Sequence, residues 1–202
     1  MNTVVTSREK ILAVCRELVA DKGLPAVNMR TVAEHCRVAL GSLYYYFPSK
    51  DDLLIATIES VWVDILKLDD LAESQMNFAE FITQLTMHIK CGIDKYPNFF
   101  TAHAISLSSA GRARGCESMQ QYLALVRSRM LDVLRRDTKV DSEIFTGDFS
   151  REQLVDFILA SIMAAMSQRN FNYVTLVEVV KRTVYSKEFL FTVDKANKAK
   201  ED

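Results

Sequence analysis

The segment Asn28–Lys50 reads NMRTVAEHCRVALGSLYYYFPSK, and it decides the fold of the chain. Its first part predicts a short helix, because apolar residues recur at helical spacing. These residues are Met29, Val32, Ala33 and Cys36. Asn28 suits the N-cap of this helix, since its side-chain oxygen accepts a hydrogen bond from a backbone N–H group two or three residues on. A second short helix follows a tight turn, which is the layout of a helix-turn-helix, a unit that places one helix in the major groove of DNA.

The second helix of the unit carries its own apolar face. The residues predicted to hold it against the first helix are Val38, Leu43, Tyr46 and Phe47. Arg37 stands in the turn where glycine is usual, and a left-handed backbone there costs other residues roughly 1 kcal/mol. The alternative interpretation is an ordinary pair of core-packing helices, in which the run Tyr44–Tyr46 is only amphipathic packing.

A family pattern is present in the same segment. An apolar-alanine pair stands at Val32-Ala33, Val38 follows it, and Gly41–Lys50 reads GSLYYYFPSK. The segment resembles the DNA-binding domain of the TetR/AcrR family of bacterial one-component transcriptional regulators, over about Thr6 to Leu54. The resemblance implies a regulator, most often a repressor, that binds double-stranded DNA at a palindromic operator as a homodimer and responds to a small-molecule effector.

Three residues depart from the family pattern. Arg37 replaces the usual turn glycine, Ala39 stands where a serine or threonine often caps the recognition helix, and Leu40 stands where a polar or basic residue is common. The base preference of a relative therefore cannot be transferred to this chain.

Candidate DNA contacts follow from position in the motif. The predicted DNA-binding residues are Arg30, Arg37, Leu40, Gly41, Ser42, Tyr44, Tyr45 and Lys50. Arg30 and Lys50, each at the start of a helix, suit phosphate contacts, which set register without reading sequence. Thr6 and Arg8 are predicted to add similar contacts.

The recognition helix itself is predicted to read the bases. Ser42 and Tyr45 reach base edges in this interpretation, and Leu40 offers an apolar contact to a thymine methyl group. Gly41 allows close approach of the backbone. Tyr44 resembles the family tyrosine that touches the DNA backbone.

The composition predicts an all-α protein. The chain has 202 residues, 49% of them hydrophobic, and only three prolines. Residues 1–50 carry seven Lys/Arg and four Asp/Glu, a balance of +3, whereas the remainder carries 18 and 22, a balance of −4. This division supports a DNA-facing N-terminal part, because an acidic remainder limits non-specific binding.

We predict about nine helices in an N-terminal helix-turn-helix domain (residues 1–50), a helical effector-binding and dimerisation domain (51–193) and a charged tail (194–202). A capping box at Thr6–Glu9 opens the first helix, which ends at Gly23. An acidic link covers Asp69–Gln75, and a basic loop covers Gly111–Gly115. The final helix is predicted from about Tyr173 to Phe189.

The last two predicted helices are apolar on more than one face, so each needs two partners. A second copy of the same pair, related by a two-fold axis, supplies the other partner, and the resemblance implies the same interface. The alternative is a monomer in which these helices are simply central. The predicted interface residues are Leu159, Met163, Met166, Val177, Val180 and Val184.

Large, soft side chains in the middle of the chain suggest an apolar effector pocket. The predicted lining residues are Trp62, Phe81, Phe99, Phe100, His103, Met119, Tyr122 and Phe157. Ordinary core packing explains most of them individually, and a pocket is an under-filled core, so both interpretations stand.

Other classes of protein have little support in the sequence. No glycine-rich phosphate loop, nucleophile elbow or paired acid and base predicts an enzyme, and no cofactor is expected. His88 and Cys91 share a helix face, but without a second pair at ligand spacing we predict no metal site. No apolar stretch reaches the length of a membrane span, so we expect a cytoplasmic protein whose four cysteines are buried free thiols. A helical adaptor of the same fold that has lost DNA binding is the remaining alternative.

Overall fold

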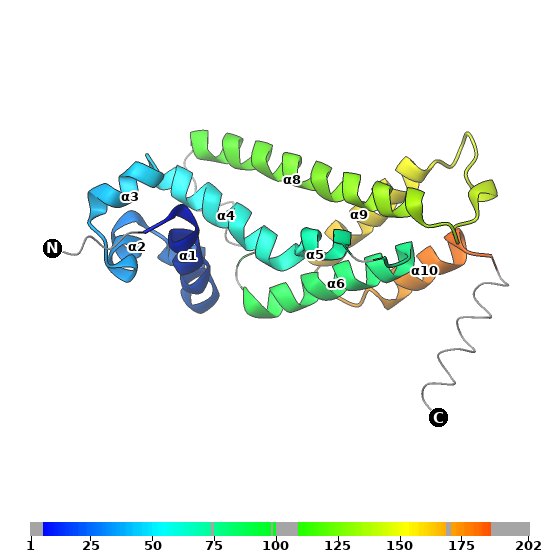
Figure 1. The fold of residues 1–202 in the computed structure, drawn as a ribbon, viewed down its shortest axis with the longest axis horizontal. Coiled ribbons are helices and arrows are strands. Elements are labelled where there is room, and N and C mark those ends of the chain that lie inside the picture. The colour runs from blue at the N-terminus through cyan, green and yellow to red at the C-terminus, as the bar shows by residue number, and fades with distance from the viewer. Residues whose placement is uncertain (1–5, 74, 98, 100–108, 169–170, 187–202) are drawn as a thin grey trace, which may run out of the picture. The chain divides into compact units, whose positions relative to one another are not determined.

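The structure is a computed structural model that describes residues 6–73, 75–97, 99, 109–168 and 171–186. The predicted all-α class is confirmed, and β structure within these ranges consists of two isolated bridges, Val140–Tyr185 and Thr146–Phe149. Figure 1 shows the helices in chain order. They are α1 (Arg8–Lys22), α2 (Met29–Cys36), α3 (Leu40–Tyr46), α4 (Lys50–Leu66), α5 (Leu68–Glu73), α6 (Phe78–Lys95), α8 (Ser109–Arg136), α9 (Arg151–Ser167) and α10 (Val174–Val184).

The chain forms two compact units. Unit 1 comprises residues 1–67 and 88–123, and therefore holds α1 to α4, the end of α6 and the first half of α8. Unit 2 comprises residues 68–87 and 124–202, with α5, the start of α6, the end of α8, α9 and α10. The predicted functional boundary at residue 50 lies inside unit 1 and stays a prediction.

Side-chain caps begin several of these helices. The Asn28 side chain accepts a hydrogen bond from the Thr31 N–H group, as predicted, and Ser49 and Ser150 cap α4 and α9 in the same way. At α1 the predicted position was wrong by one residue, because Ser7 rather than Thr6 accepts from a backbone N–H group, that of Lys10. Caps of this kind contribute about 1 kcal/mol each.

Two predicted connections are helical. The acidic link after residue 68 is α5, and the basic loop at Gly111–Gly115 is the beginning of α8. Glycine inside a helix costs about 1 kcal/mol relative to alanine, which is why the sequence suggested a loop. Gly111 is buried, however, and a Cβ atom there would lie 2.4 Å from Asp51 Oδ2. Glycine at this position therefore allows α4 and α8 to approach each other closely.

The C-terminal helix α10 ends at Val184, earlier than predicted. Tyr185 is extended (φ −115°, ψ 146°) and pairs with Val140, while the Asp141 N–H group donates to the Val184 carbonyl at 2.9 Å. Residues 187–189 of the predicted helix lie outside the described residues.

A partly buried group of hydrogen bonds, the polar knot, connects three segments of unit 2 through Tyr185, Asp137 and the first residues of α6. The Tyr185 hydroxyl donates to Asp137 Oδ2 at 2.7 Å, and Asp137 Oδ2 also accepts from the Phe78 N–H group at 2.8 Å. The Ala79 N–H group donates to the Tyr185 oxygen at 3.1 Å. Burial and the Asp137 carboxylate raise the pKa of Tyr185 well above its usual value. The knot therefore satisfies the first backbone donors of α6.

The cysteines are free but not uniformly buried. Cys15 is buried between helices of unit 1, and this burial raises its pKa to about 11. Cys36 is half-buried, whereas Cys91 and Cys116 are exposed, so the prediction of burial was wrong for these last two. Both lie on amphipathic helices, and four cysteines cannot all be assigned to the buried face from spacing alone.

Candidate DNA-binding surface

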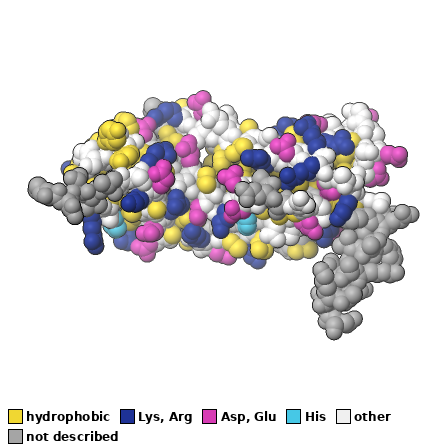
Figure 2. Space-filling model, in the orientation of Figure 1, with side chains coloured by type: hydrophobic (Ala, Val, Ile, Leu, Met, Phe, Trp, Pro, Cys, Tyr) yellow, Lys and Arg dark blue, Asp and Glu magenta, His cyan; other side chains and the backbone are white. Residues whose placement is uncertain are grey.

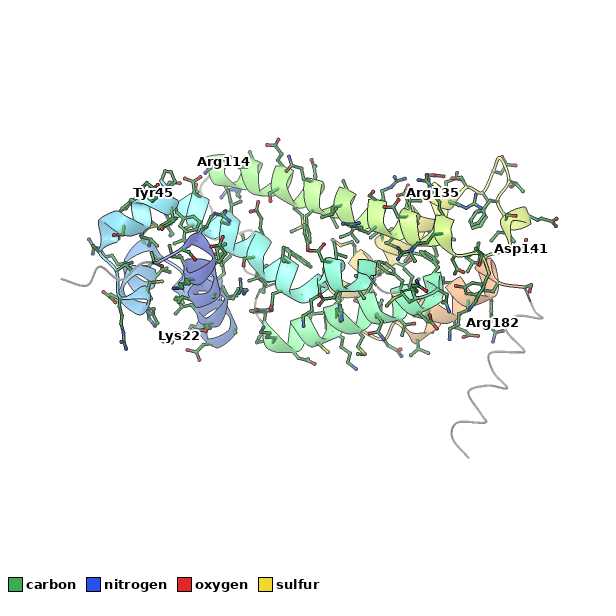
Figure 3. All side chains as sticks on the ribbon, in the orientation of Figure 1. Lys22, Tyr45, Arg114, Arg135, Asp141 and Arg182 are labelled. Atoms are coloured by element: carbon green, nitrogen blue, oxygen red, sulfur yellow. The ribbon has the colours of Figure 1, made fainter. Side chains whose placement is uncertain are left out.

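Helix α3 is anchored by one apolar face and presents an aromatic face. Leu43 and Phe47, at the same helical stripe, are buried at 0% and 2% exposure. Away from this stripe Tyr45 is 82% exposed and Tyr44 is 47% exposed, and Leu40, in the first turn of α3, is 38% exposed. Figure 2 shows yellow side chains over α3, and Figure 3 shows Tyr45 directed away from the ribbon. Exposed aromatic side chains on a short helix need a partner, because core packing does not use them.

The turn before α3 has the predicted left-handed backbone. Arg37 has φ 55° and ψ 43°, and its N–H group donates to the Glu34 carbonyl at 3.0 Å. The Val38 N–H group donates to the Ala33 carbonyl, so the end of α2 is closed by this turn. Ala39 begins α3 without a side-chain hydrogen bond, in agreement with the missing Ser/Thr cap.

Replacement of Arg37 by glycine is expected to stabilise unit 1 by about 0.5–1 kcal/mol. Glycine removes the left-handed penalty of roughly 1–2 kcal/mol, and part of this gain is offset by the greater freedom of the unfolded chain. Urea denaturation followed by helicity measures the change. The matched control is Arg37→Ala, which removes the same charge but keeps a Cβ atom, and equal gains for both variants would attribute the effect to charge.

Two contacts fix the C-terminal end of α3 against α1. The Tyr46 hydroxyl donates to the Thr6 carbonyl at 2.9 Å, and the Arg8 guanidinium lies 5.4 Å from the centre of the Phe47 ring. Tyr46 also meets Tyr45 edge to face, with ring centres 5.2 Å apart. The Tyr46 hydroxyl contact was not predicted, because a tyrosine in an apolar stripe gives no sequence signal for a partner 40 residues away.

The predicted cationic contacts are accessible. Arg30 in the first turn of α2, Lys50 in the first turn of α4, and Arg8 at the start of α1 are all exposed. Gly41 and Ser42 are exposed in the first turn of α3, and a Cβ atom at Gly41 would meet nothing within 4 Å. Packing within the chain therefore does not require glycine at this position, which agrees with a close external approach.

The predicted effector residues separate into two groups. Trp62 meets Phe99 edge to face at 5.7 Å between ring centres, and Trp62, Met119 and Tyr122 line a cavity of about 20 Å³ in unit 1. This volume is that of about one water molecule, so a larger ligand needs these helices to separate. In unit 2, Phe81 is fully buried and Phe157 is 57% exposed on α9. Phe100 and His103 lie outside the described residues.

The predicted dimer residues also differ in burial. Val180 and Val184 are buried inside unit 2 and offer no surface to a partner chain, whereas Met163 is 42% exposed. Leu159, Met166 and Val177 are half-buried. Exposed apolar side chains absent from the predicted interface lie on the same two helices: Phe157, Val174 and Val179.

Comparisons with known proteins agree with this geometry. Residues 11–57 match the model of bacterial regulatory proteins of the tetR family. Over 51 residues the chain is 47% identical to the HTH-type transcriptional repressor KstR of Rhodococcus jostii and 43% identical to KstR of Mycobacterium tuberculosis. Residues 11–57 are therefore similar to the DNA-binding domain of tetR-family regulators.

The similarity to these curated relatives covers one part of the chain. The matched segment spans 25% of this chain and about a quarter of each relative, 24% and 23% respectively. Solved structures extend the likeness to the whole fold. Escherichia coli NemR in its reduced form has a TM-score of 0.56 at 19% identity, covering 88% of this chain and 97% of that one. A TetR regulator from Legionella pneumophila has a TM-score of 0.56 at 21% identity, covering 91% and 100%.

Two other kinds of feature, a metal cluster and a membrane span, are absent from the part of the chain that the structure describes. There, no three His, Cys, Asp or Glu side chains gather closely enough to hold a metal ion. None of the described helices is long and apolar enough to span a membrane.

Proposed function

We propose that the protein is a transcriptional repressor that binds a palindromic operator as a homodimer and releases it when a small apolar or aromatic effector binds. The observation that carries the proposal is the two-sided character of α3. Leu43 and Phe47 are buried, while Tyr44 and Tyr45 face solvent in the part of a helix-turn-helix that enters the major groove. Arg30 and Lys50 flank this helix as phosphate contacts.

The proposed dimer joins α9 and α10 of two subunits. Phe157, Ala160, Met163 and Ala164 form an exposed stripe on α9, and Val174 and Val179 are exposed on α10. The two small residues allow close helix contact, and the large ones supply apolar area. A dimer also supplies the affinity that a single seven-residue recognition helix lacks, by reading two half-sites.

The proposed effector site is the aromatic cluster of unit 1. Trp62 of α4 and Met119 and Tyr122 of α8 line the small cavity where an apolar ligand would enter, and Phe99 packs against Trp62. A ligand that separates these helices shifts the equilibrium between positions of α4. Three residues connect α4 to α3, so α3 moves with it.

Selection of bound duplexes from a random pool tests the proposal. A repressor of this type enriches a palindromic consensus, and a gel shift with that duplex then shows a dimer. Release by a small molecule in the same assay identifies the effector class. Enrichment of no sequence, with a well-folded protein, would favour the helical adaptor over the repressor, and binding of a single half-site by a monomer would remove the dimer.

Lys50→Ala is expected to weaken binding to operator and random DNA alike. Lys50 is exposed in the first turn of α4, where a phosphate contact positions the protein without reading bases. The slope of log affinity against log salt concentration should fall by about one. Lys90→Ala, which removes the same charge from an exposed position on α6, is the control. An unchanged salt slope for Lys50→Ala would contradict the phosphate contact.

A further inference from the structure

Helix α4 is held differently along its two halves, both within unit 1. The second half is tied to α1 and α6. Arg16 donates to the Ser60 hydroxyl, and Asp64 accepts from Lys95 and from Tyr96, each at 2.7 Å. Burial acts to raise the pKa of Asp64, but these two hydrogen bonds hold it below its usual value.

Close packing also fixes this second half. Gly92 of α6 lies so near Ile65 that a Cβ atom on the glycine would stand 2.6 Å from two side-chain carbons. His88 Nδ1 lies 3.0 Å from the Leu66 carbonyl. A core contact of this kind does not slide without loss of packing, because interiors are close to crystalline density.

The first ten residues of α4, Lys50–Glu59, are held by the beginning of α8 through contacts of another kind. Arg114 Nη1 donates to Asp52 Oδ1 at 2.6 Å, and the Ser118 hydroxyl donates to Glu59 Oε1 at 2.5 Å. Gly111 lies against Asp51. The α8 residues are three and four positions apart, so they form one stripe along that helix. Figure 3 shows Arg114 at the beginning of α8.

These contacts are partly exposed to solvent. The Arg114 and Asp52 side chains are 50% and 29% exposed. Beside them an open hollow of about 520 Å³ is lined by Arg8, Phe47, Asp52, Glu59, Arg114 and Glu117. Hydrogen bonds from Ser49 and Arg114 hold the pKa of Asp52 below its usual range, so the carboxylate is ionised at neutral pH. A hydrated ionic contact can separate and re-form at small cost, unlike the Gly92–Ile65 contact.

Asp51 and Asp52 lie in the first turn of α4, and only Phe47, Pro48 and Ser49 separate that helix from α3. We propose that Gly111, Arg114 and Ser118 of α8 form a clamp on the start of α4, which holds the recognition helix in the position from which it binds the operator. The inference rests on the proposed function. Its consequence is that α8, which also carries Met119 and Tyr122 of the effector cluster, acts on α3 through the clamp.

The first test loosens the clamp. Arg114→Gln is expected to weaken operator binding two- to fivefold, the range that a partly exposed ion pair supplies, while binding to random DNA stays nearly unchanged. Without this ion pair the recognition helix is less ordered before it binds. Ordering it on the operator costs free energy, whereas binding to random DNA does not require that order. Lys90→Gln, which removes a positive charge from an exposed position on α6, is the control. An equal loss on both kinds of DNA, or equal effects of the two variants, would overturn the clamp.

The second test locks the clamp. The Cβ atom of residue 111 would lie 2.6 Å from Asp51 Cγ, so the two Cβ atoms, one C–C bond further apart at most, lie within about 4.1 Å of each other, a separation that a disulfide can span. Asp51→Cys combined with Gly111→Cys, in a chain whose exposed Cys91 and Cys116 are replaced by serine, should therefore form a disulfide without DNA. We expect the oxidised protein to bind operator at least as tightly as its own reduced form.

The outcomes of the locking experiment are distinct. Failure to form the disulfide would show that α8 does not lie on the start of α4, and loss of operator binding on oxidation would show that the clamp holds an inactive position. Either result overturns the inference and leaves the DNA-binding proposal standing. A wild-type protein that selects no duplex, even though the disulfide forms, would instead overturn the proposed function and the role of the clamp with it.

Discussion

Replacement of Asp137 by alanine is expected to destabilise unit 2 by about 3 kcal/mol. The carboxylate accepts from the Phe78 N–H group and the Tyr185 hydroxyl through one oxygen, and from the Lys139 N–H group at 3.0 Å through the other. Alanine leaves the Phe78 N–H group without this acceptor and leaves the Tyr185 hydroxyl with Asn77 Oδ1, at 3.1 Å, as its remaining acceptor. An unsatisfied buried donor costs about 1–3 kcal/mol. Urea denaturation followed by helicity measures the loss.

Two variants separate the knot from a general effect of removing an acid. Tyr185→Phe removes the hydroxyl but keeps the packed ring, so we expect a smaller loss of about 1–2 kcal/mol. Asp148→Ala removes a carboxylate from an exposed loop and should change stability by less than about 0.5 kcal/mol. Equal stability of Asp137→Ala and Asp148→Ala would show that the knot contributes nothing.

The knot also predicts a dependence of stability on alkaline pH. The folded-state pKa of Tyr185 is raised, chiefly by burial, so the neutral hydroxyl is favoured in the folded chain. This contribution is fully present below the unfolded tyrosine pKa of about 10 and is lost as the pH rises above it. Tyr185→Phe should remove that part of the pH dependence.

Local structure could be predicted from the sequence where a single residue and its immediate neighbours determine the backbone conformation. Asn28 was predicted as a cap because its side-chain oxygen suits a backbone donor, and Arg37 was predicted to be left-handed because the motif requires that turn. The prediction was wrong, or could not be made, where a residue far away in the sequence determines the local structure. Gly111 suggested a loop, yet it is helical because α4 approaches it closely, and Asp137 gave no signal of its contact with Tyr185.

The candidate site divides in the same way. The exposed face of α3 follows from helical spacing, since Leu43 and Tyr45 must point to different sides of a short helix. Burial of Val180 and exposure of Phe157 could not be deduced in that way, because both lie on helices that are apolar on more than one face. Which face meets the core depends on the neighbouring helices rather than on the helix itself.

Replacement of Tyr45 by alanine is expected to lower operator affinity about 10- to 100-fold with little change in stability. The side chain is 82% exposed, so its removal costs the folded chain no core packing. A lost contact to a base edge costs about 1–3 kcal/mol of discrimination. Titration of the selected palindrome and of a random duplex, at the same salt concentration, measures the change in specificity.

The neighbouring tyrosines make this experiment selective. Tyr45→Phe keeps the ring and its edge-to-face contact with Tyr46, so the difference between Phe and Ala at this position separates the ring from the hydroxyl. Tyr44→Ala should instead weaken operator and random DNA together, as loss of a backbone contact does. If Tyr45→Ala and Tyr44→Ala lower affinity for both duplexes equally, neither side chain reads sequence, and specificity must come from Leu40, Ser42 or the shape of the DNA.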